Sequence, residues 1–168
     1  SVTRDDLPDQ GAGQFVRTIE AVRKMDPDIK IEILIPDFRG VRKELDRVCQ
    51  ARPDMFNHNI ETVPRLYPLA RPQAQFDRSL NVLEYAARQG LKVKSGIMLG
   101  LGETEEEILE TMDDLRQAGC RVMTIGQYLQ PTLVNHPVKE YVHPEVFKKY
   151  EEIGLKKGFS FVESSPLV

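Results

Sequence analysis

Residues 93–108 constrain the fold most, because they join a strand, a glycine-rich loop and the start of a helix. The apolar, β-rich run at residues 91–99 ends at the sequence G-L-G, whose glycines allow the backbone to turn sharply. Thr104 and Glu107 then form a capping box that opens a helix. In a parallel α/β domain, the carboxyl end of such a strand is where ligands bind.

The charges near this loop disfavour a phosphate ligand. A glycine-rich loop before a helix attracts anions through its free N–H groups and the positive end of the helix dipole. Here Glu103 and the glutamates at residues 105–107 crowd the first turn, and no Gly-Lys-Ser/Thr follows. A hydroxyl-rich or cationic ligand fits better. An ordinary well-capped helix explains the same residues, so both interpretations stay open here.

Strands alternate with amphipathic helices along the chain, which predicts a parallel βα repeat in a single domain spanning residues 1–168. The predicted strands cover residues 29–35, 55–56, 91–99, 120–125 and 159–163. The predicted helices are centred on residues 15–22, 41–48, 76–87, 108–118 and 146–153, with proline-bearing loops at 64–72 and 132–143. The chain begins as if at the end of a strand, so we expect it to be the interior of a longer protein.

Composition excludes several classes of protein. The 23 basic and 26 acidic residues are interleaved and give a net charge of -3, so neither nucleic acid nor a membrane surface is an expected partner. No apolar run is long enough for a membrane span, and the first residues lack the features of a signal peptide, which favours a cytoplasmic protein. Cys49 and Cys120 are too far apart for a metal knuckle, and we expect both to be buried thiols.

Five polar segments are predicted to meet at one edge of the sheet, because parallel strands with right-handed crossovers bring their carboxyl ends together. These segments are R-D-D-L, P-D-F-R-G, N-H-N-I-E-T, G-L-G-E-T and G-Q-Y-L-Q-P, at residues 4–7, 36–40, 57–62, 100–104 and 126–131. They contain neither a Ser-His-Asp order nor a His-x-x-x-His helix. The edge suits a ligand with amines, hydroxyls and a heterocycle, and the catalytic residues stay unassigned.

Single polar residues at this edge have simpler interpretations as well. A histidine without a partner, such as His58, more often satisfies loop carbonyls than binds a ligand. His136 and His143 lie in loops beside prolines, where histidines are more often solvated. Arg65 and Arg71 fit either surface charges or a clamp for a carboxylate.

At these segments the sequence resembles the lipoyl synthases, which belong to the radical S-adenosylmethionine (SAM) superfamily. The match runs through T-R-D-D-L-P-D, P-D-F-R-G, F-N-H-N-I-E-T-V-P-R-L-Y, R-P-Q-A-Q-F, K-S-G-I-M-L-G-L-G-E-T, G-Q-Y-L-Q-P-T and S-P-L-V. One such motif is weak evidence, but a series in the right order is strong. The resemblance implies an α/β fold, a partial (βα)6 TIM-like barrel of the radical SAM type that lacks its first strand and cluster loop.

The resemblance also implies a reaction. A reduced four-iron cluster cleaves SAM to a deoxyadenosyl radical, which abstracts hydrogens from an octanoyl chain amide-linked to a lysine of a carrier protein. An auxiliary cluster supplies the two sulfur atoms. The implied cofactors are therefore SAM and two [4Fe-4S] clusters. The implied partners are an octanoylated lipoyl carrier and a reductant such as ferredoxin or flavodoxin, in the cytoplasm or, in a eukaryote, in a mitochondrion or plastid.

The SAM-binding residues that the resemblance implies fall into six groups. The glycine-rich contact consists of Gly96, Met98, Gly100 and Glu103, and the polar end of a strand carries Asn57 and Asn59, with Lys94 and Ser95 beside it. Arg71 is the partner for the carboxylate of SAM. Gln127, Tyr128 and Leu129 form the segment along the adenine, and Asp5 and Asp6 belong to the acidic loop. The family usually has two glycines after the acidic loop, where this chain has Gln10 and Gly11.

The cluster ligands are the largest departure from the family. Its cysteine motifs would lie before Ser1, and its Arg-Ser-Ser-Tyr would follow Val168. Cys49 and Cys120 do not have the spacing that a cluster needs. We expect the SAM-binding part of a lipoyl synthase that is inactive by itself. A non-catalytic barrel-derived binding or scaffold protein, and another radical SAM enzyme, are the alternatives.

Overall fold

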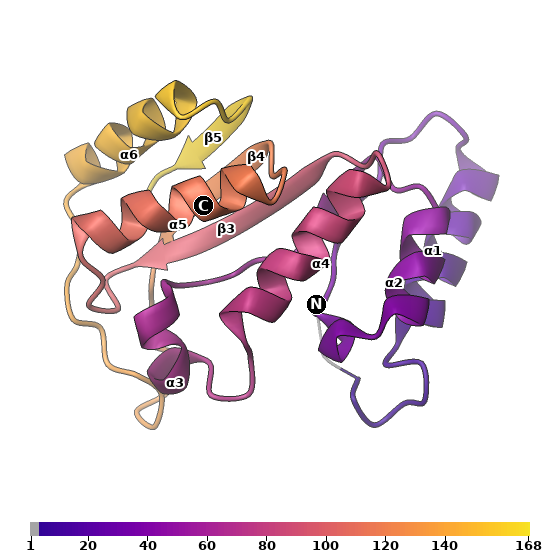
Figure 1. Ribbon diagram of the computed structural model, residues 1–168, viewed down its shortest axis with the longest axis horizontal. Helices are drawn as coiled ribbons and strands as arrows, with labels where there is room; N and C mark the ends of the chain where they lie inside the picture. The colour runs from indigo at the N-terminus through magenta and orange to yellow at the C-terminus, as the bar shows by residue number, and fades with distance from the viewer. Residues whose placement is uncertain (1–3) are drawn as a thin grey trace.

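The computed structural model describes residues 4–168, so Thr3, which opens the first motif, lies outside the described residues (Figure 1). The helices are α1 (Ala12–Met25), α2 (Arg42–Gln50), α3 (Tyr67–Ala70), α4 (Phe76–Arg88), α5 (Glu105–Gln117) and α6 (Pro144–Lys156). The strands are β1 (Glu32–Leu34), β2 (Met55–Asn57), β3 (Val93–Leu99), β4 (Val122–Gln127) and β5 (Phe161–Ser164). Two 3-10 turns, η1 (Phe38–Gly40) and η2 (Pro64–Leu66), complete the elements.

The strands form one five-stranded parallel sheet in chain order, β1-β2-β3-β4-β5. Figure 1 shows α4, α5 and α6 lying side by side across one face of this sheet, while α1 and α2 pack together at its β1 end. The sheet is open, with β1 and β5 at its edges. This arrangement confirms the predicted α/β fold and its partial-barrel character. Within residues 4–168, no helix has both the length and the apolar character needed to cross a bilayer.

Local sequence signals set several boundaries where expected. The Thr104 hydroxyl accepts a hydrogen bond from the Glu107 N–H, and the Glu107 carboxylate accepts one from the Thr104 N–H, which confirms the capping box of α5. Helix α6 begins at Pro144, where the missing N–H loses no helical bond. The buried apolar side chains form one continuous cluster, which includes Cys49 and Cys120. Both thiols are buried in the core, as predicted, and burial raises their pKa to about 11 for Cys49 and about 12 for Cys120.

Two local predictions are wrong. The alternating run at residues 29–35 yields only a three-residue strand, Glu32–Leu34, which pairs with the three residues Met55–Asn57 of β2. The segment predicted as a loop at residues 64–70 forms η2 and α3. Its prolines occupy first-turn positions, where a helix tolerates them.

Alternation along β3 decides which side chains face a ligand. Val93, Ser95 and Ile97 are buried toward the helices, whereas Lys94 and Met98 are partly exposed on the opposite face. The register with the neighbouring strands extends this open face across the sheet, because Lys94 pairs with Asn57 on one side and with Val122 on the other.

Candidate functional site

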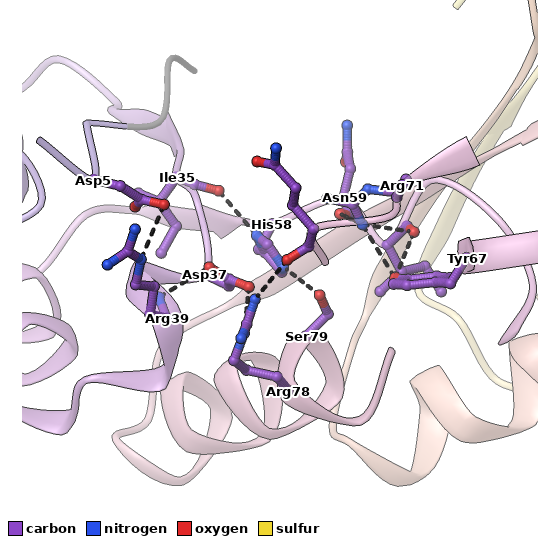
Figure 2. Close-up of polar contacts among 12 residues, drawn as sticks. Asp5, Ile35, Asp37, Arg39, His58, Asn59, Tyr67, Arg71, Arg78 and Ser79 are labelled. Atoms are coloured by element: carbon purple, nitrogen blue, oxygen red, sulfur yellow. Dashed lines mark hydrogen bonds and ion pairs between the residues drawn. The ribbon is translucent and has the colours of Figure 1, made fainter. Parts of the chain in front are cut away.

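A cleft of about 740 Å³ lies at the carboxyl ends of β1 and β2. Three of the five predicted segments line it: R-D-D-L, P-D-F-R-G and N-H-N-I-E-T. Figure 2 shows the polar side chains that these segments and α4 bring together. The polar and charged lining residues are Asp5, Asp37, Arg39, His58, Asn59, Glu61, Arg71, Gln73 and Arg78.

Two ion pairs flank the cleft. The Arg39 Nε lies 3.0 Å from the Asp5 carboxylate, and the Arg78 Nε lies 2.6 Å from the Asp37 carboxylate. The turn that carries this segment is strained, because Phe38 and Arg39 both adopt left-handed conformations with φ of 46° and 50°. The Asp37 carboxylate accepts the Arg39 N–H at 2.9 Å and stabilises the turn. The sequence pattern predicted P-D-F-R-G at this edge, but no pattern in it predicted the left-handed backbone of Phe38 and Arg39.

His58 is a structural residue beneath the cleft. Its Nδ1 lies 2.9 Å from the Ile35 carbonyl and its Nε2 lies 2.9 Å from the Ser79 hydroxyl. Because a carbonyl only accepts, Nδ1 carries the proton and Nε2 accepts from Ser79. Burial lowers the pKa of His58 below its ordinary 6.5. The histidine therefore satisfies a loop carbonyl, as expected for one without a catalytic partner.

We expect the stability of the chain to fall in mild acid because of His58. A depressed folded-state pKa favours the neutral ring, so its stability contribution is lost as the pH falls below the ordinary 6.5. The free energy of unfolding in urea should drop by about 1 kcal/mol between pH 7.5 and 5.5. The raised pKa of Glu61 opposes this slope at its lower end. His58→Gln should flatten the slope, and equal slopes in the two proteins would contradict the assignment.

Arg71 reaches the cleft from the end of α3. Its Nη1 donates to the Ile60 carbonyl at 2.9 Å and to the Tyr67 hydroxyl at 3.1 Å, and that hydroxyl itself donates to the Ile60 carbonyl at 2.7 Å. These bonds use one corner of the guanidinium group. Arg65 behaves differently, because it clamps a carboxylate of the chain itself, that of Glu107.

Glu61 is a site residue that the sequence interpretation missed. It lies in the cleft in a left-handed conformation with φ of 68°. Asn57 pairs with Lys94 and Glu61 with Ile97, so the segment after β2 carries one more residue than β3 over the same stretch. Burial raises the pKa of the Glu61 carboxyl group. The alternation that grouped Asn57 with Asn59 would have reached Glu61 one step further along.

Gly96 allows two polar side chains to approach β3 closely. A Cβ atom at this position would lie 2.3 Å from the Thr124 hydroxyl oxygen and 3.1 Å from the Asn59 side-chain oxygen. That Asn59 oxygen is buried and has no hydrogen-bond partner among residues 4–168. A buried acceptor without a partner is costly, so it marks a place where a ligand donor can bind.

Lys94 and Asn57 converge on Glu32, a residue that the sequence interpretation did not include. The Lys94 ammonium group lies 2.8 Å from the Glu32 carboxylate, to which the Asn57 amide donates at 3.0 Å. Ser95 does not share this face, which corrects the prediction that it projects beside Lys94. It is fully buried on the helix side, where its hydroxyl accepts the Ile60 N–H at 3.3 Å, because successive strand residues point to opposite faces.

The glycine loop, residues 100–104, is occupied by the chain itself. The Glu103 carboxylate accepts the N–H groups of Gly100 at 2.6 Å and Leu101 at 2.9 Å. A Cβ at Gly100 would lie 2.3 Å from the Glu140 carbonyl oxygen, and Lys139 donates its N–H to the Gly100 carbonyl. Gly100 and Glu103 therefore hold the loop and the segment packed on it, and their contact with SAM stays a prediction.

The segment after β4 is also engaged. The Gln127 side chain bonds the backbone of Tyr128, Glu140 and Val142, and the backbone N–H of Tyr128 donates to the Leu99 carbonyl at 2.8 Å. Tyr128 is buried and its hydroxyl donates to the His136 carbonyl, whereas Leu129 is 58% exposed. The backbone N–H groups of Gln127 and Tyr128 bond to carbonyls within the chain, and the contact of this segment with the adenine stays a prediction.

The acidic loop contributes one residue to the cleft. Asp5 lines it, whereas Asp6 pairs with the exposed Arg4 at 2.7 Å and lies outside the lining. Asp9 accepts the N–H groups of Gly11 and Gly13 at the start of α1, and these bonds lower the pKa of its carboxyl group.

All five segments share the carboxyl edge of the sheet, in two adjoining groups. The cleft group and the glycine-loop group are joined by backbone bonds between Glu61 and β3, and by Arg65, which donates to the Gly102 carbonyl at 2.8 Å. No cluster of three metal-ligating side chains exists among residues 4–168. The arrangement can bind hydroxyl groups at Asn59 and Glu61 and a carboxylate at Arg71.

One family model and a set of relatives match this chain. The model of the radical SAM superfamily matches residues 5–115. The chain is similar over its whole length to proteins named lipoyl synthase, with 57% identity to that of Treponema denticola, 55% to that of Bacteroides thetaiotaomicron and 55% to that of Rubrobacter xylanophilus. It spans 58%, 60% and 53% of the lengths of these relatives.

Solved structures match the fold at low sequence identity. A domain of a pyruvate-formate lyase-activating enzyme from Bacteroides vulgatus aligns with a TM-score of 0.67 and 10% identity, over 92% of this chain and 94% of that one. Methylornithine synthase aligns with a TM-score of 0.65 and 16% identity, over 90% of this chain and 52% of that one. At these identities the likeness concerns the fold alone.

Proposed function

The chain belongs to the radical SAM superfamily, and we propose that it forms the SAM-binding part of a lipoyl synthase. The unpartnered Asn59 oxygen beside Gly96, with the Glu61 carboxylate in the same cleft, is the observation that carries this proposal. The similarity to lipoyl synthases along the whole chain supports it independently.

The side chains in the cleft fit the chemistry of SAM. Its ribose presents two hydroxyl donors, which suit the free Asn59 acceptor and the Glu61 carboxylate. Its carboxylate suits the guanidinium of Arg71, which uses mainly Nη1 for its bonds within the chain. SAM carries no phosphate group, so the carboxylates that line this edge do not repel it as they would repel a phosphate ligand.

Bound SAM would supply the deoxyadenosyl radical after reductive cleavage. The role of this chain is to bind and orient SAM: Asn59 and Glu61 hold the ribose, and Arg71 holds the amino-acid end. Gly96 and Met98, on the same face of β3 as Lys94, are proposed to continue this site along the strand. The glycine loop and the Gln127 segment act as supports behind this site.

The clusters are proposed to be held by other parts of the full-length enzyme. The 168 residues contain two cysteines, both buried, and burial raises the pKa of each, which disfavours the thiolate that iron binds. We therefore propose that these residues alone are inactive. We also propose an octanoylated lipoyl carrier as the protein substrate and a ferredoxin or flavodoxin as the reductant.

The test uses the full-length gene product, reconstituted anaerobically with iron and sulfide and supplied with SAM, a strong reductant and an octanoyl-lysine peptide. A lipoyl synthase would hold two clusters per chain and yield deoxyadenosine together with lipoyl product. Deoxyadenosine without lipoyl product would identify another radical SAM enzyme. Absence of clusters and of SAM binding would identify a barrel-derived binding protein.

A further inference from the structure

An ion pair joins the two groups of loops at the carboxyl edge of the sheet. Arg65 lies in η2, three residues after the end of N-H-N-I-E-T, and its Nε and Nη2 contact the two carboxylate oxygens of Glu107 at 2.6 and 2.9 Å. The same Nη2 donates to the Gly102 carbonyl at 2.8 Å. The planar fork thus holds both the first turn of α5 and the glycine loop that precedes it.

The glycine loop needs external restraints. Gly100 and Gly102 have φ of 95° and 108°, in the region where glycine is free and other residues are rarely found. His136 and Lys139 hold the loop from the β4 side, and Glu103 holds it from within. Among residues 4–168, Arg65 is the one side chain that hydrogen-bonds the loop from the side of Asn59 and Glu61.

We propose that Arg65 is a positioning residue for SAM, which sets the spacing between the Asn59–Glu61 segment and the glycine loop through Glu107 and Gly102. This inference rests on the proposed function, because it concerns how the same site is assembled. Arg65 does not line the cleft and touches no ligand-facing group directly. Its effect on SAM is therefore through the loops it joins.

A neighbouring ion pair supplies a matched control. Lys149 of α6 contacts Glu105 at 2.6 Å, again in the first turn of α5, and its side chain is 50% exposed against 55% for Arg65. Lys149 makes no hydrogen bond to the glycine loop in the described structure. A surface pair of this kind contributes little to stability by itself. A difference in SAM affinity between a variant of the Arg65 pair and a variant of the Lys149 pair therefore reports on the contact with the glycine loop.

The experiment measures SAM binding by equilibrium dialysis with the reconstituted full-length enzyme. We expect R65M to raise the Kd of SAM roughly tenfold, because a small displacement of Asn59 and Glu61 relative to the rest of the site has a large effect on binding. The KM of the octanoyl peptide should stay within about twofold, and the Tm should match that of K149M. R65K, which lacks the fork but keeps the charge, should fall between wild type and R65M.

A double-mutant cycle with E107Q adds a readout that a purely structural role would not give. Glutamine at this position preserves the capping box, so E107Q removes the charge pair without removing the cap. If the pair acts as a unit, the double variant R65M/E107Q should bind SAM no more weakly than R65M. Equal SAM affinity in R65M and K149M would overturn the inference. Failure of the wild-type enzyme to bind SAM would instead overturn the proposed function.

Discussion

Gly100→Ala should destabilise the fold severely, although the substitution adds only one methyl group. The new Cβ would lie 2.3 Å from the Glu140 carbonyl oxygen and 2.5 Å from the Gln127 Nε2. The first of these is a backbone atom, so relief requires the segment after β4 to move away from the loop. The left-handed φ of 95° adds backbone strain. Together we expect a loss of about 3 kcal/mol or more in the free energy of unfolding.

Gly90→Ala is the matched control for that measurement. Gly90 has a similar φ of 78°, but a Cβ there would meet nothing within 4 Å. It should therefore show only the backbone strain, about 1 kcal/mol. Thermal unfolding followed by circular dichroism separates the two, with an expected extra fall in Tm of roughly 4–8 °C for Gly100→Ala. Equal losses in the two variants would show that the segment does not pack on the loop.

Glu61→Gln should weaken SAM binding without weakening the fold. The carboxylate offers a charged acceptor for a ribose hydroxyl, and the neutral amide removes the charge and replaces one oxygen by a donor. Because hydrogen bonds to charged groups contribute about 1.5–3 kcal/mol, the Kd of SAM for the full-length enzyme should rise at least roughly tenfold. Glu163→Gln is the control, since this exposed carboxylate of β5 lies outside the cleft.

The pH dependence of the Glu61 variant follows from the raised pKa. Burial favours the protonated form in the folded chain, so this group stabilises the fold most at low pH, and that contribution is lost as the pH rises through the raised value. At pH 7 Glu61→Gln should therefore be at least as stable as wild type. SAM binding has the opposite sign: it needs the carboxylate, so wild-type affinity should fall as the pH drops through that pKa. A wild-type pH profile that persists in Glu61→Gln would exclude this role.

The order of elements could be predicted from the sequence because it depends on local chemistry. The capping box at Thr104 and Glu107 and the proline that opens α6 fix where helices begin. The parallel rule then brings the five polar segments to one edge, as observed. The burial of Cys49 and the bond of His58 to a loop carbonyl likewise followed from residue type and the lack of partners.

Which groups remain free for a ligand was decided by tertiary structure alone. Gly100 and Glu103 belong to a glycine-rich sequence that suggests a ligand loop, yet distant residues, Glu140 and Lys139, occupy the Gly100 side of it. Conversely, Glu61 lies in the cleft and the Asn59 oxygen has no hydrogen-bond partner among residues 4–168. A hydrogen bond between segments far apart in the chain depends on how strands pair and which face each side chain takes. Local sequence therefore sets the elements and the edge, whereas only the packed chain determines which donors and acceptors are already used.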